Sequence, residues 1–331
     1  MRNRILIAIA ALIIVMLSGC TNNIDLPNNF ELPIGQKFYC SVIADCNVEE
    51  KNVEIPDVIV IKDVKVLPIV ENRVKPNSSI DVLVTLENKD SENPITIEDI
   101  RINPGIFNCE CPSCKCSDTS KPRINPGQIK TFNFKLRAPD IEGTLALSAT
   151  LEVSVKYSYR SVRKASITFI TEDVFKQYIE SDKKVPISII NVPSDGPVEL
   201  YLDISKIYQP VILDSEKSYQ IYLEIRNKGS GEIEKIESGD LTLEFEDMEL
   251  EDCSDEFDGE DCQGKTAVSN TEDIVLRGSI PKKYYFSFKP SKNLKIPQGQ
   301  LTETKIITAK ASYTYRISKS IELVVSPRAE I

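Results

Sequence analysis

The most regular feature of the chain is an alternation of apolar and polar residues with a period of two, which is typical of strands that bury one face. Residues 79–90, SIDVLVTLENKD, alternate from Ile80 to Leu86 and end in the turn residues Asn88 and Lys89. Residues 218–229, SYQIYLEIRNKG, repeat this arrangement at an offset of 139 positions (218 minus 79). The pattern therefore predicts a protein built mainly of β-strands.

Further landmarks recur in the same order along the chain. Residues 131–135, TFNFK, return as residues 285–289, YFSFK, and residues 155–160, VKYSYR, return as residues 311–316, ASYTYR. Each Tyr-x-Tyr motif precedes an apolar segment that predicts a last strand, residues 164–170 in the first case and residues 320–325 in the second. Landmarks repeated in a constant order indicate an internal duplication.

We predict an all-β fold with two tandem Ig-like β-sandwich domains, at residues 53–170 and 191–327, because each copy contains about seven strands at regular turn spacing. The order of strand, Asn-Lys turn, strand and Phe-x-Phe strand resembles the Ig-like domains repeated in cell-adhesion-related surface proteins of bacteria and archaea. This resemblance implies a stalk, an adhesion module or another envelope component, and it assigns no functional residue.

A short helix is expected to connect the two copies within residues 171–190. In the segment TEDVFKQYIESDKK, Thr171 can cap a helix that has acidic residues early and lysines late. Val174, Phe175, Tyr178 and Ile179 would share one apolar face of this helix.

The N-terminal segment, MRNRILIAIAALIIVMLSGC, has the parts of an export signal. Arg2 and Arg4 precede an apolar run, residues 5–17, which is shorter than the roughly 20 residues of a membrane-spanning helix. The final LSGC resembles the lipobox of prokaryotic lipoproteins, which implies cleavage before Cys20 and attachment of a diacylglycerol to its thiol. An uncleaved signal anchor with a chance cysteine is the alternative.

Both interpretations predict an extracytoplasmic protein that the membrane holds at the cell surface or envelope. Residues 1–19 would be the lipoprotein signal peptide, and residues 20–52 would be a tether with a small loop between Cys40 and Cys46. Envelope proteins or polysaccharide are the further partners expected there. Nucleic acid is not an expected partner, because the formal net charge is −10 and phosphate backbones require a surplus of Lys and Arg.

The chain has nine cysteines, so acylation of Cys20 would leave eight for pairing. An exported chain meets oxidising conditions, in which neighbouring cysteines form disulfides. The candidates fall into three groups: Cys40 with Cys46, the cluster of Cys109, Cys111, Cys114 and Cys116, and Cys253 with Cys262.

The cluster of four cysteines has two other interpretations. Four thiolates could bind zinc, and Cys111 and Cys114 have the C-x-x-C spacing of redox sites. However, zinc modules usually separate two such pairs by about a dozen residues, and Pro112 opposes the helix start that redox sites use. We therefore expect structural disulfides, with an extracytoplasmic metal-binding or redox lipoprotein as the alternative.

The absence of histidine excludes Ser-His-Asp triads, Cys-His pairs and His-ligated metals. We predict a non-catalytic protein without a cofactor, which serves a structural, adhesion or binding role. A carboxylate-dependent polysaccharide hydrolase is the enzymatic alternative.

Two further sites are suggested by short segments. Calcium is an alternative ligand for the acidic residues 244–262, and its candidate ligands are Asp255, Glu256, Asp258, Glu260 and Asp261. The simpler interpretation of this segment is an acidic surface hairpin closed by Cys253 and Cys262. Asn77, in the sequence NSS, begins the one glycosylation sequon.

Overall fold

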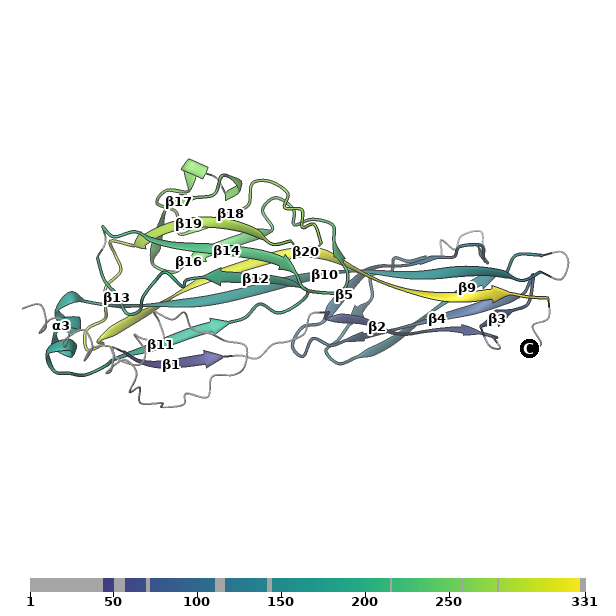
Figure 1. Cartoon of the computed structure of the whole chain (residues 1–331), viewed down its shortest axis with the longest axis horizontal. Helices are drawn as coiled ribbons and strands as arrows, with labels where there is room; N and C mark the ends of the chain where they lie inside the picture. The colour runs from purple at the N-terminus through teal and green to yellow at the C-terminus, as the bar shows by residue number, and fades with distance from the viewer. Residues whose placement is uncertain are drawn as a thin grey trace, which may run out of the picture.

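The computed structural model describes residues 44–50, 57–69, 72–110, 117–141, 145–214, 216–257, 259–278 and 280–327. The described chain is mostly strand, and it forms two β-sandwiches that lie end to end along one long axis (Figure 1). The prediction of an all-β fold with two sandwiches is confirmed.

Each sandwich has one four-stranded sheet of its own. In the first sandwich the order is β2 (Ile59–Leu67), β4 (Ser79–Asn88), β9 (Ile129–Arg137) and β6 (Asn108–Cys109). In the second sandwich it is β12 (Val198–Asp203), β14 (Tyr219–Asn227), β19 (Lys282–Pro290) and β17 (Met248–Cys253). β4 and β14 contain the alternating segments, and β9 and β19 contain the Phe-x-Phe motifs, so the duplicated segments occupy equivalent places.

A third sheet runs through both sandwiches, and its centre is the pair of strands β10 (Leu147–Ile170) and β20 (Thr302–Val325). Each strand has 24 residues, and the two pair antiparallel along their whole length. At about 3.3 Å per residue, this ribbon is about 80 Å long. Its central pair is Ser158 and Thr314, the middle residues of the two Tyr-x-Tyr motifs.

Each long strand begins in one sandwich and ends in the other. The first part of β10 pairs with β5 (Ile95–Asn103) in the first sandwich, and its end pairs with β13 (Val211–Ile212) in the second. β20 runs the opposite way: it pairs first with β16 (Leu241–Phe245) in the second sandwich and then with β3 (Arg73–Val74) in the first. The two copies therefore exchange the ends of their last strands.

This exchange differs from the predicted domain limits. The limits 53–170 and 191–327 keep each last strand in its own copy, which would require a turn after each Tyr-x-Tyr motif. Residues 160–164, RSVRK, and 316–320, RISKS, contain none of the turn-forming residues Gly, Pro, Asn and Asp. The chain continues straight, so residues 160–170 belong to the second sandwich and residues 317–325 to the first.

Shorter strands complete the shared sheet. On the side of β5 these are β7 (Ser117–Asp118) and β8 (Arg123–Ile124), and along β20 and β16 they are β15 (Glu232–Ile233) and β18 (Ala267–Ser269). On the opposite edge, β11 (Val185–Val192) pairs with β10 and carries β1 (Ala44–Glu50) in parallel, with Ala44 opposite Val185.

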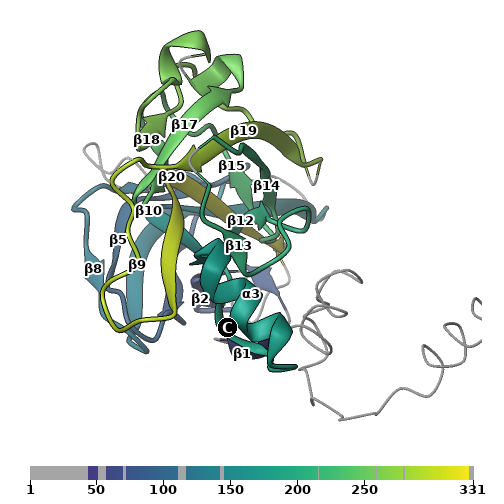
Figure 2. The ribbon, with the colours of Figure 1, turned by 90° about the vertical axis from the view of Figure 1, so that its left-hand side faces the viewer.

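A helix is confirmed as α3 (Glu172–Glu180), but it joins β10 to β11 at the outer end of the second sandwich and does not connect one sandwich to the other (Figure 1, Figure 2). The Thr171 hydroxyl accepts a hydrogen bond from the amide of Val174 at 3.4 Å, so Thr171 is the N-cap. Three residues of the predicted apolar face, Val174, Phe175 and Tyr178, pack against a small cluster formed by Ile170 and β11. Ile179 differs from the prediction, because its side chain is 52% exposed.

Within the described residues, no helix has the length and apolar character that crossing a bilayer requires. Residues 1–19, for which a signal peptide is predicted, lie outside the described part of the chain.

We expect core substitutions at the ends of β10 and β20 to loosen the sandwich of the other copy. Leu323 is 1% exposed and lies in the first sandwich, whereas Ile167 is 0% exposed and lies in the second. Leu323→Ala should lower the free energy of unfolding by about 2–5 kcal/mol. It should also speed hydrogen exchange in β4 and β9 more than in β14 and β19. Ile167→Ala is the matched variant and should show the reverse pattern; faster exchange within the copy that carries each substitution would contradict the strand exchange.

Candidate functional site

The two sandwiches meet at the middle of the ribbon, where the Tyr-x-Tyr motifs place four tyrosines. Tyr157 packs against Tyr315 with ring centroids 5.7 Å apart, and Tyr159 packs against Tyr313 at 6.3 Å. All four side chains are buried. Because buried tyrosine hydroxyls usually have hydrogen-bond partners, the bonds of Tyr159, Tyr313 and Tyr315 show which segments of the two sandwiches are joined.

Tyr159 connects loops of both sandwiches. Its hydroxyl donates a 2.9 Å hydrogen bond to the carboxylate of Asp90, in the loop between β4 and β5. The same carboxylate accepts hydrogen bonds of 2.8 Å from the backbone amides of Glu92 and Asn93, which fixes the loop. Asp195, which precedes β12 in the second sandwich, also lies beside Tyr159 and accepts a 3.3 Å hydrogen bond from the amide of Val162.

The equivalent tyrosine of the second copy, Tyr315, makes a corresponding set of contacts. Its hydroxyl donates to the side-chain oxygen of Asn227 at 2.9 Å and accepts from the amide of Gly231 at 3.0 Å. The neighbouring amide of Ser230 donates at 3.1 Å to Asp57, which precedes the first strand of the first sandwich. The two sides of the junction therefore correspond. Asp57, at the start of the first sandwich, contacts the loop bound to Tyr315, and Asp195, before the first strand of the second sandwich, lies beside Tyr159.

Tyr313, the first tyrosine of the second Tyr-x-Tyr motif, also joins segments that are far apart in the sequence. The Tyr313 hydroxyl lies 2.8 Å from the hydroxyl of Ser161 and accepts a hydrogen bond from the amide of Val198 at 3.2 Å. The Ser161 hydroxyl lies 2.7 Å from the carbonyl oxygens of both Asp195 and Val198 and can donate its single proton to either one. These bonds bind the start of β12 to the exchanged part of β10.

The pKa values of the two carboxylates near Tyr159 are shifted in opposite directions by their surroundings. Burial tends to raise the pKa of Asp90, but the two backbone amides and the Tyr159 hydroxyl outweigh this effect and leave the pKa lowered. Burial raises the pKa of Asp195, and the nearby charge of Asp90 adds to the effect. Burial likewise raises the pKa of Tyr315 to about 12, so its hydroxyl keeps its proton at neutral pH.

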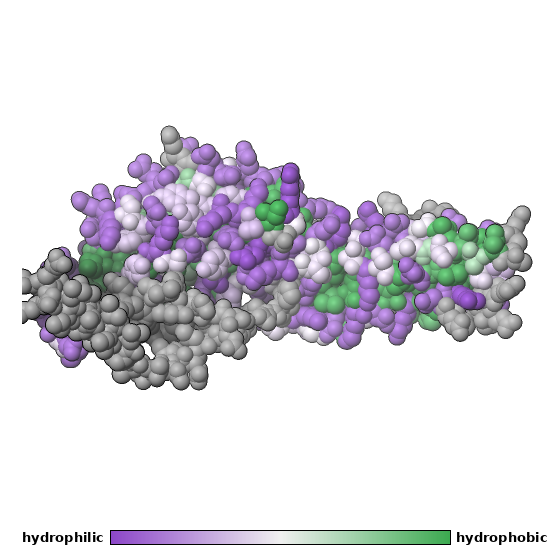
Figure 3. Space-filling view, in the orientation of Figure 1, coloured by the Kyte–Doolittle hydropathy of each residue, from purple (hydrophilic) through white to green (hydrophobic). Residues whose placement is uncertain are grey.

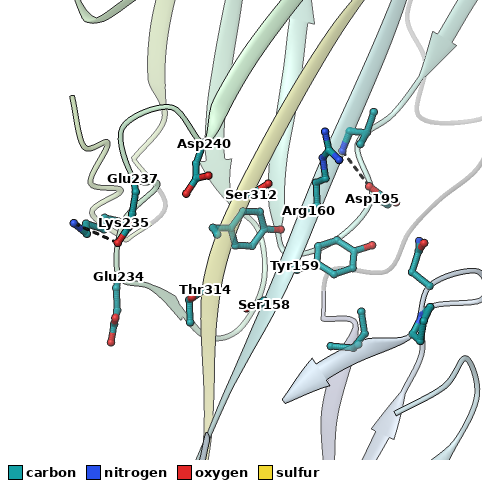
Figure 4. Close-up of a pocket in the computed structure, with 15 residues that line it drawn as sticks. Ser158, Tyr159, Arg160, Asp195, Glu234, Lys235, Glu237, Asp240, Ser312 and Thr314 are labelled. Atoms are coloured by element: carbon teal, nitrogen blue, oxygen red, sulfur yellow. Dashed lines mark hydrogen bonds and ion pairs between the residues drawn. The ribbon is translucent and has the colours of Figure 1, made fainter. Parts of the chain in front are cut away.

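An open hollow of about 640 Å³ lies beside this junction (Figure 4). From the ribbon, Ser158 and Arg160 of β10 and Ser312 and Thr314 of β20 line it. Five charged residues of the second sandwich also line it: Asp195, Glu234, Lys235, Glu237 and Asp240.

Several charged side chains in and around this hollow form ion pairs. Glu234 binds Lys156 at 2.6 Å and also binds Arg316, so it joins β10 and β20 across the ribbon. Lys235 binds Asp273 at 2.6 Å. The serine hydroxyls have no imidazole to activate them, because the chain contains no histidine. The hollow is suited to hydrogen bonding with a polar ligand or a polar segment of another protein.

The cysteines predicted to pair are described in part. Cys253 and Cys262 form a disulfide with a Cα–Cα distance of 6.4 Å, and both side chains are buried. Cys109 is disulfide-bonded and packs against the core of the first sandwich. Cys20, Cys40, Cys111, Cys114 and Cys116 lie outside the described residues, as does the side chain of Cys46.

The described residues of the acidic segment do not gather into a metal site. Asp255 and Glu256 lie in the short 3-10 helix Asp255–Phe257, and they are exposed, as is Asp261. Within the described ranges, no three His, Cys, Asp or Glu side chains are placed to hold one ion. Asp258 and the side chain of Glu260 lie outside the described part. The placed residues fit an acidic surface hairpin closed by the Cys253–Cys262 disulfide.

Asn77, the sequon residue, lies exposed in a turn with a left-handed backbone (φ 54°), a conformation that asparagine tolerates well. Its side chain is accessible to modification.

The junction residues Asp57, Asp90 and Asp195 were not singled out from the sequence. Their proximity to the tyrosines depends on the strand exchange, which brings segments together that are distant in the chain. The available signal was the pair of Tyr-x-Tyr motifs, each followed by a segment without Gly, Pro, Asn or Asp.

Comparisons with known proteins leave the family open. No family model and no curated protein matches the chain. Among solved structures, one similar chain is the Escherichia coli alpha-2-macroglobulin activated by porcine elastase, at 10% identity and a TM-score of 0.16. The match covers 80% of this chain and 32% of that one, and a TM-score this low does not establish a shared fold. The fold and junction thus define the class of protein on their own: a pair of β-sandwiches joined by exchanged strands.

We expect Asp90→Asn and Asp195→Asn to have opposite effects on stability at pH 7. Asp90 has a lowered pKa, so its charged form stabilises the fold at any pH above the ordinary pKa of 3.8. This contribution is lost as the pH falls through the lowered pKa. Asp90→Asn should therefore lower the free energy of unfolding by about 1–2 kcal/mol.

Asp195 has a raised pKa, so any stabilisation from its protonated form is lost as the pH rises through that pKa. Asp195→Asn should accordingly be neutral or stabilising at pH 7. Urea unfolding of both variants between pH 3 and pH 7 measures these effects. Equal destabilisation by both variants at pH 7 would contradict the electrostatic description of the junction.

Proposed function

We propose that this protein is a lipid-anchored, non-catalytic component of the cell envelope, in which the two sandwiches form one rigid spacer. The observation that supports this proposal most is the β10–β20 ribbon, which continues through both sandwiches without interruption. Tandem domains joined by a linker can move relative to one another. Here a bend at the junction would break backbone hydrogen bonds in the middle of two continuous strands.

The position of β1 suggests how the spacer is oriented. Ala44 lies opposite Val185, close to α3, and residues 1–43 therefore join the described chain at the end of the second sandwich. If Cys20 carries a lipid, the second sandwich is the one nearer the membrane, although it comes later in the sequence. The first sandwich then points away from the membrane.

The outer end of the first sandwich has features of a contact surface. Ile106, Leu145 and Leu147 are 39%, 79% and 44% exposed, and Figure 3 shows apolar surface at this end. The turn before Ile106 lies against β10, since a Cβ on Gly105 would be 2.8 Å from the carbonyl oxygen of Thr150. Exposed apolar groups at the tip of a stalk favour contact with another envelope protein.

The alternative function, a metal-binding or redox lipoprotein, has less support. It requires free or metal-bound thiols in the cluster at residues 109–116, and Cys109 is disulfide-bonded. A disulfide at this position favours a structural role for the cluster.

The lipid anchor is tested by the mass of the membrane-extracted protein. We expect cleavage before Cys20 and the added mass of a diacylglycerol, with Cys20→Ala as the control that loses the lipid. A full-length, unmodified chain in the soluble fraction would overturn the proposed anchoring.

The orientation is tested by fluorescence quenching from labelled lipids. A fluorescent amino acid at Asp182, in the turn after α3, should be quenched strongly. The same label at Asn77 lies at the other end of a ribbon about 80 Å long and should not be quenched. Stronger quenching at Asn77 than at Asp182 would contradict this orientation.

A further inference from the structure

We propose that one side of the second sandwich binds an acidic polysaccharide, such as a chain of uronic acid sugars. The site, called here the lysine–tyrosine surface, consists of Lys206, Tyr208, Lys217, Tyr219, Tyr222 and Lys283. The proposal rests on the proposed envelope location for the choice of ligand, and otherwise on the contacts below.

The first part of this surface is a hollow of about 410 Å³ near α3. Lys206, Tyr208, Lys217 and Tyr219 line it, together with apolar residues that include Phe175 and Ile212. None of the residues that line this hollow is acidic, although the whole chain has 50 acidic and 40 basic residues. A hollow of positive charge in an acidic protein favours an anionic ligand.

The second part is the outer face of the sheet next to this hollow. Tyr222 of β14 lies opposite Tyr285 of β19, with ring centroids 5.8 Å apart. Lys206 and Lys283 reach the Tyr222 ring, with their amino groups 5.0 and 4.3 Å from its centroid. Lys217 lies 5.6 Å from the ring of Tyr219 in the same way.

The three lysines are available to a ligand. Among the residues that the structure describes, none of them forms an ion pair with a carboxylate. Glu224 lies opposite Lys283 in the sheet, but it pairs with Arg226 instead. All three lysines are exposed. A carboxylate of a ligand would therefore find cations whose contacts within the protein are weak.

Tyrosine rings beside lysines suit a sugar that carries a negative charge. The C–H groups on the face of a sugar ring are apolar and can stack on the negative face of an aromatic ring, while hydroxyl groups remain free for hydrogen bonds. Tyr208 is 50% exposed and offers such a ring at the edge of the hollow. The carboxylate of a uronic acid would supply the partner for Lys206, Lys217 or Lys283.

The position of the surface favours a long chain over a bilayer. β12, β14 and β19 run along the long axis of the molecule (Figure 1), so the outer face of their sheet lies on its side, and the hollow lies where this side meets the α3 end. A bilayer that holds the α3 end would meet the tip, whereas a linear polymer can lie along the side.

Binding of the full-length protein, kept in detergent, to polygalacturonate tests this inference. We expect the wild-type protein to bind polygalacturonate and not neutral dextran, and binding should weaken with added salt. The double variant Lys206→Ala, Lys283→Ala and the single variant Tyr222→Ala should each weaken binding about tenfold or more. Tyr222→Phe should retain binding, because it keeps the ring.

Lys130→Ala is the matched control, because Lys130 lies 5.5 Å from the ring of Phe132 in the first sandwich and has no place in the proposed site. It should bind as the wild type does, and circular dichroism melts should confirm that all variants are folded. Absence of wild-type binding, an equal loss in Lys130→Ala, or binding to phosphatidylglycerol vesicles but not to polygalacturonate would each overturn the inference. None of these outcomes bears on the lipid at Cys20, which intact mass tests separately.

Discussion

The uninterrupted pairing of β10 with β20 is the interaction on which the rest of the structure depends. Both strands run for 24 residues, and their register is constant from one end of the molecule to the other. Each sandwich obtains one of its core strands from the other copy, so neither has a complete core alone. Leu323, from the second copy of the sequence, is buried in the first sandwich. Ile167, from the first copy, is buried in the second sandwich.

The polar junction adds a second constraint to this backbone pairing. A buried hydroxyl that loses its partner costs about 1–3 kcal/mol, and the junction contains several such groups. Tyr159 with Asp90 and Tyr315 with Asn227 hold equivalent loops on opposite sides of the central pair of Ser158 and Thr314. The arrangement is that of a two-fold symmetric dimer whose halves have been joined in one chain. Rigidity at this point supports the proposed role as a spacer, because motion at the junction would disrupt both the ribbon and these bonds.

Much of the fold could be predicted from local sequence. The alternation from Ile80 to Leu86 gave the buried face of β4, and Thr171 identified the start of the helix. The spacing of Cys253 and Cys262 gave a pair that the structure contains. These features depend on residues close together in the chain, where periodicity, capping and short loops act directly.

Local sequence does not determine the strand exchange or the junction. A Tyr-x-Tyr motif followed by an apolar segment fits either a hairpin within one copy or a straight strand that enters the other, and both bury the same residues. Residues 160–164 and 316–320 contain no Gly, Pro, Asn or Asp, which fits the straight strand, but the exchange appears only when both copies are placed together. The contact of Asp90 and Asp195 with Tyr159 follows from that placement.

Equilibrium unfolding in urea, followed separately in the two sandwiches, tests the central claim most directly. Site-specific probes can be placed in β4 for the first sandwich and in β14 for the second. If the exchanged strands make the two sandwiches one cooperative unit, both probes should report a single transition with the same midpoint and slope. Two separate transitions, with one sandwich intact while the other is unfolded, would contradict the account.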